Sequence, residues 1–216
     1  MRPKLIIFDF DGTLADTKKS IFKTMTITLN HFGKKCGDES SLLKIKNLIG
    51  TPLTRIFKEF GLKDDQFEEA TLFYRSIYNE IAGKTVELYP FVKDTLDHLS
   101  KEGVKLAVAS NKGKDALEYI LTAQGIMSYF EIVAGEQDVD KGRKKPAPDM
   151  ANLVMSKTGI APKDTLIVGD TSIDTYMARN AFCQSCIVNY GYGSEESIKE
   201  SAPSYSIDCF SELKRE

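Results

Sequence analysis

The segment Asp9-Phe10-Asp11-Gly12-Thr13-Leu14 places two carboxylates two residues apart, directly after the apolar run 5–8. A short apolar run indicates a buried strand, and open α/β sheets bind ligands at the carboxyl ends of their strands. Gly12 would let the backbone turn sharply and approach a ligand closely. Asp-Gly pairs are also common in simple turns and calcium loops, so this segment alone leaves those interpretations open.

Two further segments carry polar side chains that suit the same site. Ser110 and Asn111 end the apolar run that begins at Lys105, and a hydroxyl and an amide can hold a phosphoryl oxygen. Lys145 directly precedes Pro146. Because proline can open a helix, we expect this lysine at the mouth of a helix.

A second pair of carboxylates, Asp170 and Asp174, follows another apolar run at a spacing of one helical turn. Convergence with Asp9 and Asp11 would cost on the order of several kcal/mol per like-charge pair near the surface. A hard divalent cation removes that cost, and ligands that are all oxygen favour magnesium over zinc. The sequence therefore predicts a Mg²⁺ site with Lys145 offsetting the remaining charge.

The elements that must position these residues are apolar runs separated by helical patterns. Runs that are apolar on both faces are typical of buried parallel strands, and alternating helices are typical of crossovers between them. The expected strands are 5–8, 105–110, 131–134, 165–169 and 185–189, and the expected helices are 91–102, 113–124, 147–158 and 173–181. Gly103, Gly125 and Gly159 stand where helices would end. The pattern predicts an α/β fold with a doubly wound, Rossmann-like parallel sheet.

Residues 17–86 interrupt this alternation, because they show no strand pattern and are far more than a crossover needs. Apolar spacing over 21–32, a Thr-Pro pair opening 51–60 and spaced aromatic residues over 67–81 predict helices. We therefore expect an all-helical cap domain. Its bounds would be 17–86, the core domain would comprise 1–16 and 87–216, and the hinges would be 15–17 and 86–90.

The composition is that of a soluble globular protein, with 42% hydrophobic and 28% charged residues among 216. The net charge of −2 gives no broad attraction to nucleic acid. The amino-terminal apolar run is too short for a signal peptide or a membrane span. Because no secretory signal is recognised, the four cysteines are expected to be free thiols of a cytoplasmic protein. Cys183 and Cys186 have the spacing of a zinc site but lack its two further ligands.

Together these segments resemble the haloacid dehalogenase superfamily of phosphatases over essentially the whole chain. The four motifs of that family match residues 9–14, 110–111, 145–149 and 169–174, in this order. Within the superfamily the chain is most similar to the phosphoglycolate phosphatase group, whose helical cap, of the C1 type, is inserted after the first motif. The resemblance implies a phosphoric monoester hydrolase.

The resemblance also implies roles for single residues. Asp9 would attack phosphorus and form an aspartyl-phosphate, while Asp11 would protonate the leaving oxygen and then activate water. The Mg²⁺ ligands would be the side chains of Asp9 and Asp170 and the backbone carbonyl of Asp11. Asp174 would bind through water or orient Lys145. The set that contacts the phosphoryl group would comprise Ser110, Lys145 and Asn111 with the backbone of Phe10, Gly12 and Thr13. Asp11 argues against dehalogenation, since a carbon–halogen bond needs no protonated leaving group.

By the same resemblance, the cap loop with Thr51 and Arg55 is the expected element that contacts substrate. A helix amino terminus after Thr51 and the Arg55 guanidinium could both hold an anionic group, although Arg55 could equally be a solvated surface charge. The expected substrate is a small phosphorylated metabolite, such as phosphoglycolate. A phosphosugar mutase, a pyrophosphatase, a nucleotidase and a non-catalytic regulatory protein remain alternatives. A monomer and a weak homodimer are both open.

Overall fold

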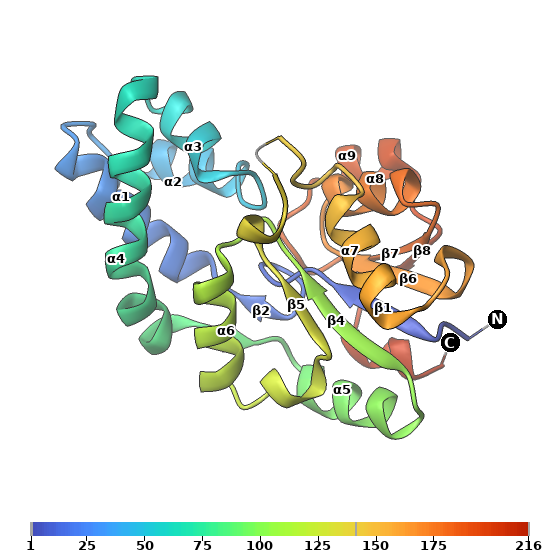
Figure 1. Ribbon diagram of the computed structural model, residues 1–216. Coiled ribbons are helices and arrows are strands. Elements are labelled where there is room, and N and C mark those ends of the chain that lie inside the picture. Colours follow the sequence, from blue (N-terminus) through green and yellow to red (C-terminus); the bar gives the residue numbers. More distant parts are fainter. Residues whose placement is uncertain (1, 141, 216) are drawn as a thin grey trace.

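The computed structural model describes residues 2–140 and 142–215, and its centre is a six-stranded parallel sheet (Figure 1). The strands lie in the order β5-β4-β1-β6-β7-β8, and every neighbouring pair is parallel. Their bounds are β1 Leu5–Phe8, β4 Lys105–Ala109, β5 Ile132–Ala134, β6 Thr165–Gly169, β7 Gln184–Val188 and β8 Tyr205–Ile207. Since β1 lies between β4 and β6, the segments that follow these three strands meet at one edge of the sheet.

Alternate residues of β1 pack on opposite faces of the sheet. Leu5 and Ile7 belong to a buried cluster with apolar residues of the helices at 149–158 and 172–180, whereas Ile6 and Phe8 belong to a larger cluster with residues of the helices at 92–101 and 114–123. This burial on both faces explains why the strand is an unbroken apolar run. The helices of the core are α5 Val92–Lys101, α6 Lys114–Ala123, α7 Asp149–Thr158, α8 Ser172–Asn180 and α9 Glu195–Ser201.

A helical insert follows β1 and stands to one side of the sheet, at the upper left of Figure 1. Its helices are α1 Lys18–His31, α2 Glu39–Lys46, α3 Leu53–Glu59 and α4 Phe67–Thr85. The apolar side chains of Met25 and Leu29 from α1 and the rings of Tyr74 and Tyr78 from α4 are buried. The insert is flanked by β2 (Ala15–Asp16) and β3 (Glu87–Leu88), which pair as a short antiparallel ribbon.

The predicted α/β fold class is confirmed, and each of the five predicted strands is present within one residue at either end. The predicted glycines do end helices: Gly159 is the C-cap of α7, and Gly103 and Gly125 directly follow the C-caps of α5 and α6 with positive φ. The short strands β2, β3 and β8 and the helices α2 and α9 were not predicted.

The predicted N-cap at Thr51 is wrong. Helix α3 begins at Leu53 with Pro52 as its N-cap, and the Thr51 hydroxyl donates to the Leu48 carbonyl at 2.7 Å. The hydroxyl therefore closes the preceding turn and is not available to cap the helix.

The sequence analysis made predictions about the cysteines and about membrane spans. None of the cysteines forms a disulfide, and burial raises the pKa of the Cys183 thiol to about 11, which makes it a poor nucleophile. Among the helices of residues 2–140 and 142–215, none combines the length and the apolar character needed to cross a bilayer.

Candidate active site

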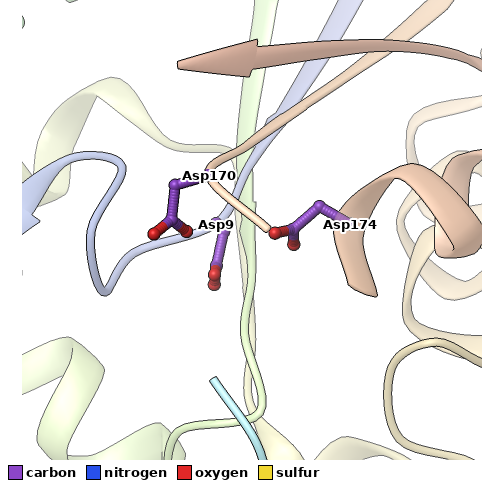
Figure 2. A group of neighbouring side chains, drawn as sticks. All are labelled: Asp9, Asp170 and Asp174. Carbon is purple, nitrogen blue, oxygen red and sulfur yellow. The ribbon is translucent and has the colours of Figure 1, made fainter. Parts of the chain in front are cut away.

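Three carboxylates converge at the carboxyl edge of the sheet, as Figure 2 shows. Asp9 directly follows β1, Asp170 directly follows β6, and Asp174 lies in the first turn of α8. One oxygen from each lies within 4.8 Å of the others, and all three residues are buried. A buried set of hard oxygen donors suits Mg²⁺, so the residues present fit the predicted ion.

Hydrogen bonds from nearby amides and hydroxyls hold two of these carboxylates, Asp174 and Asp170, in place. Asp174 Oδ2 accepts hydrogen bonds from the amide of Thr171 at 3.1 Å and from its hydroxyl at 2.9 Å, which forms a capping box at the start of α8. Asp170 Oδ2 accepts from the amide of Tyr192 at 2.7 Å, and Asp170 Oδ1 accepts from the hydroxyl of Thr13 at 3.4 Å.

Lys145 is the cation of the cluster. Its Nζ lies 2.9 Å from Asp9 Oδ1 and 2.7 Å from Asp174 Oδ1. Burial opposes its charge, but the carboxylates of Asp174 and Asp9 outweigh that effect and raise the pKa of Lys145. The side chain of Asn111 holds the lysine backbone: it accepts from the Lys145 amide at 2.9 Å and donates to the Lys145 carbonyl at 3.2 Å. Three carboxylates and one ammonium leave a net negative charge that a divalent cation can neutralise.

Asp9 is the least satisfied member of the cluster. Its buried Oδ1 lies 2.9 Å from the Lys145 ammonium and accepts no well-aligned hydrogen bond within the described residues. Burial raises the pKa of Asp9 to about 6; Lys145 opposes this rise, and Asp174 and Asp11 add to it. Burial likewise raises the pKa of Asp170, with Asp174 and Asp9 adding to the effect. Both shifts are those expected of carboxylates arranged to receive a cation.

Asp11 lies apart from this cluster. Its two carboxylate oxygens are 2.9 and 3.3 Å from Nζ of Lys112, which also lies 2.7 Å from the hydroxyl of Tyr78 in α4. Lys112 was not predicted, although it directly follows Ser110 and Asn111, and that position was the available signal. The two aspartates of the first motif thus have different partners, Lys145 for Asp9 and Lys112 for Asp11. The predicted metal ligand at Asp11 is its backbone carbonyl, and its carboxylate is used by Lys112.

The turn after Asp9 depends on Gly12. The Phe10 carbonyl accepts from the amides of Thr13, Leu14 and Ala15, and the Gly12 amide donates to the Ala15 carbonyl at 3.0 Å. The φ of Gly12 is +83°, and a Cβ there would lie 2.2 Å from Asp170 Oδ2. Only glycine fits this position, and the predicted sharp turn is present; the close neighbour of Gly12 is the Asp170 side chain. The amides of Gly12 and Thr13 hold the turn itself, whereas the Phe10 amide makes no hydrogen bond within the described residues.

A cavity of about 160 Å³ adjoins Asp11 between the insert and the core. Ser110, Asn111 and Thr51 line it as candidates for substrate contact, and the amide of Asn111 also donates to the Gly50 carbonyl of the insert at 3.0 Å.

Arg55 lies elsewhere: it is exposed and outside the cavity lining. The structure therefore does not support the expected contact of Arg55 with substrate. The physical reason is that α3 turns Ile56 and Phe57 inward, which directs Arg55 outward. The arginine that lines the cavity is Arg75 of α4, which was not predicted and forms an ion pair with Glu136 of the core.

A second segment that was not predicted follows β7. The Tyr190 hydroxyl donates to the Thr13 carbonyl at 2.8 Å, and Gly191 packs so closely on Asp170 that a Cβ would lie 2.2 Å from the aspartate Cβ. The alternation of tyrosine and glycine over 190–193, directly after an expected strand, was the available signal for this segment.

Comparison with known proteins gives the class of enzyme that the sequence motifs predict. The family model described as "Haloacid dehalogenase-like hydrolase" matches residues 6–188. A phosphoglycolate phosphatase of Vibrio vulnificus is 32% identical over 97% of this chain and 94% of its own length. The pyrophosphatase PpaX of Bacillus velezensis is 29% identical over 98% of this chain and 95% of its own length.

Solved structures agree with the sequence relatives. The crystal structure of a predicted phosphoglycolate phosphatase from Haemophilus somnus has a TM-score of 0.87 and 29% identity, and the match covers 100% of this chain and 98% of that one. The fold and the aspartate cluster thus define an α/β phosphatase. The chain belongs to the haloacid dehalogenase-like hydrolase family and is similar to its phosphoglycolate phosphatases.

Proposed function

We propose that this phosphatase is Mg²⁺-dependent and hydrolyses a small phosphate monoester through a phosphorylated aspartate at position 9. The observation that carries the proposal is the buried cluster of Asp9, Asp170 and Asp174 with Lys145 against two of its carboxylates. Asp9 is the candidate nucleophile by its place in the first motif, and its buried carboxylate lies 2.9 Å from the Lys145 ammonium.

The metal would be held by the side chains of Asp9 and Asp170 and by the backbone carbonyl of Asp11. Asp174 would contribute from a greater distance or through Lys145, since both of its oxygens already accept hydrogen bonds. When bound, the ion neutralises negative charge on the carboxylates and on the phosphoryl oxygens.

The reaction proceeds in two displacements. In the first, a carboxylate oxygen of Asp9 bonds to phosphorus while the ester P–O bond breaks, and the carboxyl proton of Asp11 goes to the leaving oxygen. In the second, Asp11 as carboxylate takes a proton from water, whose oxygen attacks phosphorus and releases Asp9 and inorganic phosphate. The balance is one ester and one water to one alcohol and one phosphate.

The phosphoryl oxygens would be held by Lys145, by the Ser110 hydroxyl and by backbone amides. The Phe10 amide is the best placed of the predicted donors, since it is uncommitted within the described chain while those of Gly12 and Thr13 hold the turn. Asn111 would position Lys145 through its paired backbone contacts. Such fixed donors stabilise developing charge without reorganisation.

Residues 17–86 would act as a cap domain on a core of residues 1–16 and 87–216. Contacts that support this proposal are Asn111 with the Gly50 carbonyl and Lys112 with the Tyr78 hydroxyl, because both join the insert to the candidate site. The linkers at 15–17 and 86–90 would be its hinges. Closure of such a cap would exclude water from the site.

The substrate would be a small phosphorylated metabolite, for which phosphoglycolate is the first compound to test, given the names of the relatives. The free thiols support a cytoplasmic setting. The enclosed position of the site between insert and core favours a small molecule over a nucleic acid or a membrane, with the protein acting as a monomer or a weak homodimer.

The test is release of inorganic phosphate from a panel of phosphate compounds, with and without Mg²⁺. The panel includes phosphoglycolate, a sugar phosphate, a nucleoside monophosphate and pyrophosphate, and the Asp9→Asn protein is the blank. We expect release that requires Mg²⁺ and falls by at least about a thousandfold in the blank. Equal release by the Asp9→Asn protein would show that Asp9 is not the nucleophile.

A further inference from the structure

The cavity beside Asp11 is where the leaving group of the substrate must lie, if Asp11 protonates the leaving oxygen. Asp11 and Ser110, a candidate phosphoryl contact, line it, whereas Asp9, Asp170 and Asp174 do not, so it begins beside the phosphoryl site and extends from there to the insert. The wall on the insert side therefore reports the chemistry of the alcohol that leaves, not that of the phosphate.

The insert side of this cavity is predominantly apolar. The apolar and aromatic residues that line it are Ile21, Ile49, Leu53, Ile56, Tyr74 and Tyr78. The two tyrosine rings are stacked, with centroids 5.4 Å apart and planes 18° apart, and form one aromatic surface. Their hydroxyls stay neutral, because burial raises the pKa of both. A wall of this kind gains free energy from contact with an apolar ring.

The charges around the cavity leave no surplus of positive charge for a second acidic group. The lining has the carboxylates of Asp11, Asp115 and Glu136 against the cations Lys112 and Arg75. Lys112 is paired with Asp11, and Arg75 is paired with Glu136. When Asp11 carries the proton that it gives to the leaving oxygen, the charges of Lys112 and Arg75 are still balanced by those of Asp115 and Glu136, so the described lining has no positive charge left over. An additional carboxylate or phosphate would enter a partly apolar space without a counter-charge, which is unfavourable.

We infer that the leaving group is an uncharged alcohol that carries an apolar or aromatic ring, rather than a second acid such as glycolate or phosphate. The volume of about 160 Å³ agrees with this, since an apolar cavity of about 150 Å³ accommodates a benzene ring. The amide of Asn79 in the same lining supplies a polar contact for a substituent on the ring. The inference rests on the proposed function, because it places the leaving oxygen at Asp11.

The experiment compares two substrates that differ by one charge. Benzyl phosphate and 4-carboxybenzyl phosphate share a ring and a primary leaving oxygen, so kcat/KM reports the effect of the carboxylate. Phosphoglycolate and pyrophosphate represent small acidic leaving groups, and uridine 5′-monophosphate represents a larger neutral one. We expect benzyl phosphate to exceed 4-carboxybenzyl phosphate and phosphoglycolate by at least about tenfold in kcat/KM. Equal or higher values for the charged compounds would overturn the inference.

A variant tests the location. Leu53→Lys adds a cation to the cavity wall and should narrow the ratio between the two benzyl compounds at least about threefold, whereas Leu53→Met should not change that ratio. An unchanged ratio in a Leu53→Lys protein of wild-type melting behaviour would place the leaving group elsewhere and overturn the inference. Should this variant not fold, the substrate pair on the unaltered enzyme still decides the matter.

Failure of the proposed function is recognised separately. Binding of beryllofluoride with Mg²⁺, read as a thermal shift that the Asp9→Asn protein lacks, tests the aspartate site without any leaving group. A shift together with a preference for phosphoglycolate would overturn only the inference about the leaving group. No shift and no hydrolysis of any compound would overturn the proposed function and, with it, the inference.

Discussion

Asp11 differs from the other aspartates of the site in its contacts, because it pairs with Lys112 whereas Asp9 and Asp174 pair with Lys145. It contacts Lys112 of the core, and Lys112 in turn contacts Tyr78 of the insert. The Lys112 Nζ also lies 4.3 Å from the centroid of the Tyr78 ring. These contacts fix the direction of a carboxyl group that would otherwise rotate freely, so we expect Lys112 to position the acid and base of the reaction.

Replacement of Lys112 tests that role. Lys112→Met should lower kcat by about ten- to a hundredfold with a smaller change in KM, because Asp11 would lose its anchor while the phosphoryl site stays intact. Lys112→Arg keeps the charge and should recover most of the rate. Steady-state kinetics at saturating Mg²⁺ measure both values. A kcat that is equal in the wild-type and Lys112→Met proteins would contradict the positioning role.

The raised pKa of Asp9 makes magnesium binding depend on pH. A carboxyl group must lose its proton to hold the ion, so with the pKa of Asp9 at about 6 the Mg²⁺ affinity should fall as the pH drops through about 6. Below about pH 6 the protonated form accumulates, and the apparent Kd for Mg²⁺ should rise about tenfold per unit; Asp170, raised in the same direction, would steepen the change. Mg²⁺ titrations of phosphate release between pH 5 and 8 measure it, and a Kd that stays flat to pH 5 would contradict it.

At the scale of the elements, the turn between β1 and β2 decides where Asp170 lies. Gly12→Ala would force a left-handed φ on alanine and place its Cβ 2.2 Å from Asp170 Oδ2. We expect the Mg²⁺ affinity to fall at least about tenfold, because Asp170 must move. Gly103→Ala is the control: its φ is +78° and nothing lies within 4 Å of its Cβ. It should cost about 1–2 kcal/mol of unfolding free energy and leave the affinity unchanged. Equal affinities in the two variants would contradict this explanation.

The elements with strong local patterns were the ones that the sequence predicted. β1, β4 and β6 are buried on both faces, so their apolar runs and the polar residues after them could be recognised without the fold. β2 and β3 have two residues each and are defined only by their pairing with each other. Two residues are too few to show the alternation of apolar and polar side chains by which a strand is recognised in a sequence.

The same reasoning explains which site residues were found. Asp9, Lys145, Asp170 and Asp174 belong to motifs at predicted strand ends. Tyr192 was not predicted: it contacts Asp170 through its backbone amide, which any residue type could supply, and the alternation of tyrosine and glycine around it was the available signal.

At the scale of the whole molecule, the ion pair between Arg75 and Glu136 joins the insert to the core. A partly exposed pair contributes about 1 kcal/mol or less, so Arg75→Met should raise KM by about two- to fivefold and leave kcat within about twofold. Arg55→Met is the matched control from the same insert and should not change KM, since Arg55 lies outside the cavity. Equal KM values for wild-type and Arg75→Met would show that this pair does not help to hold the insert over the site.

The ribbon of β2 and β3 has a consequence for how such proteins can diversify. Ala15 pairs with Leu88, so the chain leaves the core and returns to it at adjacent positions. An inserted segment whose two ends are adjacent imposes little constraint on the sheet, whatever the length of the insert. The stretch between those ends is also one continuous piece of gene. Recombination at the two ends would therefore exchange the insert's side of the cavity and preserve the aspartate cluster of the core.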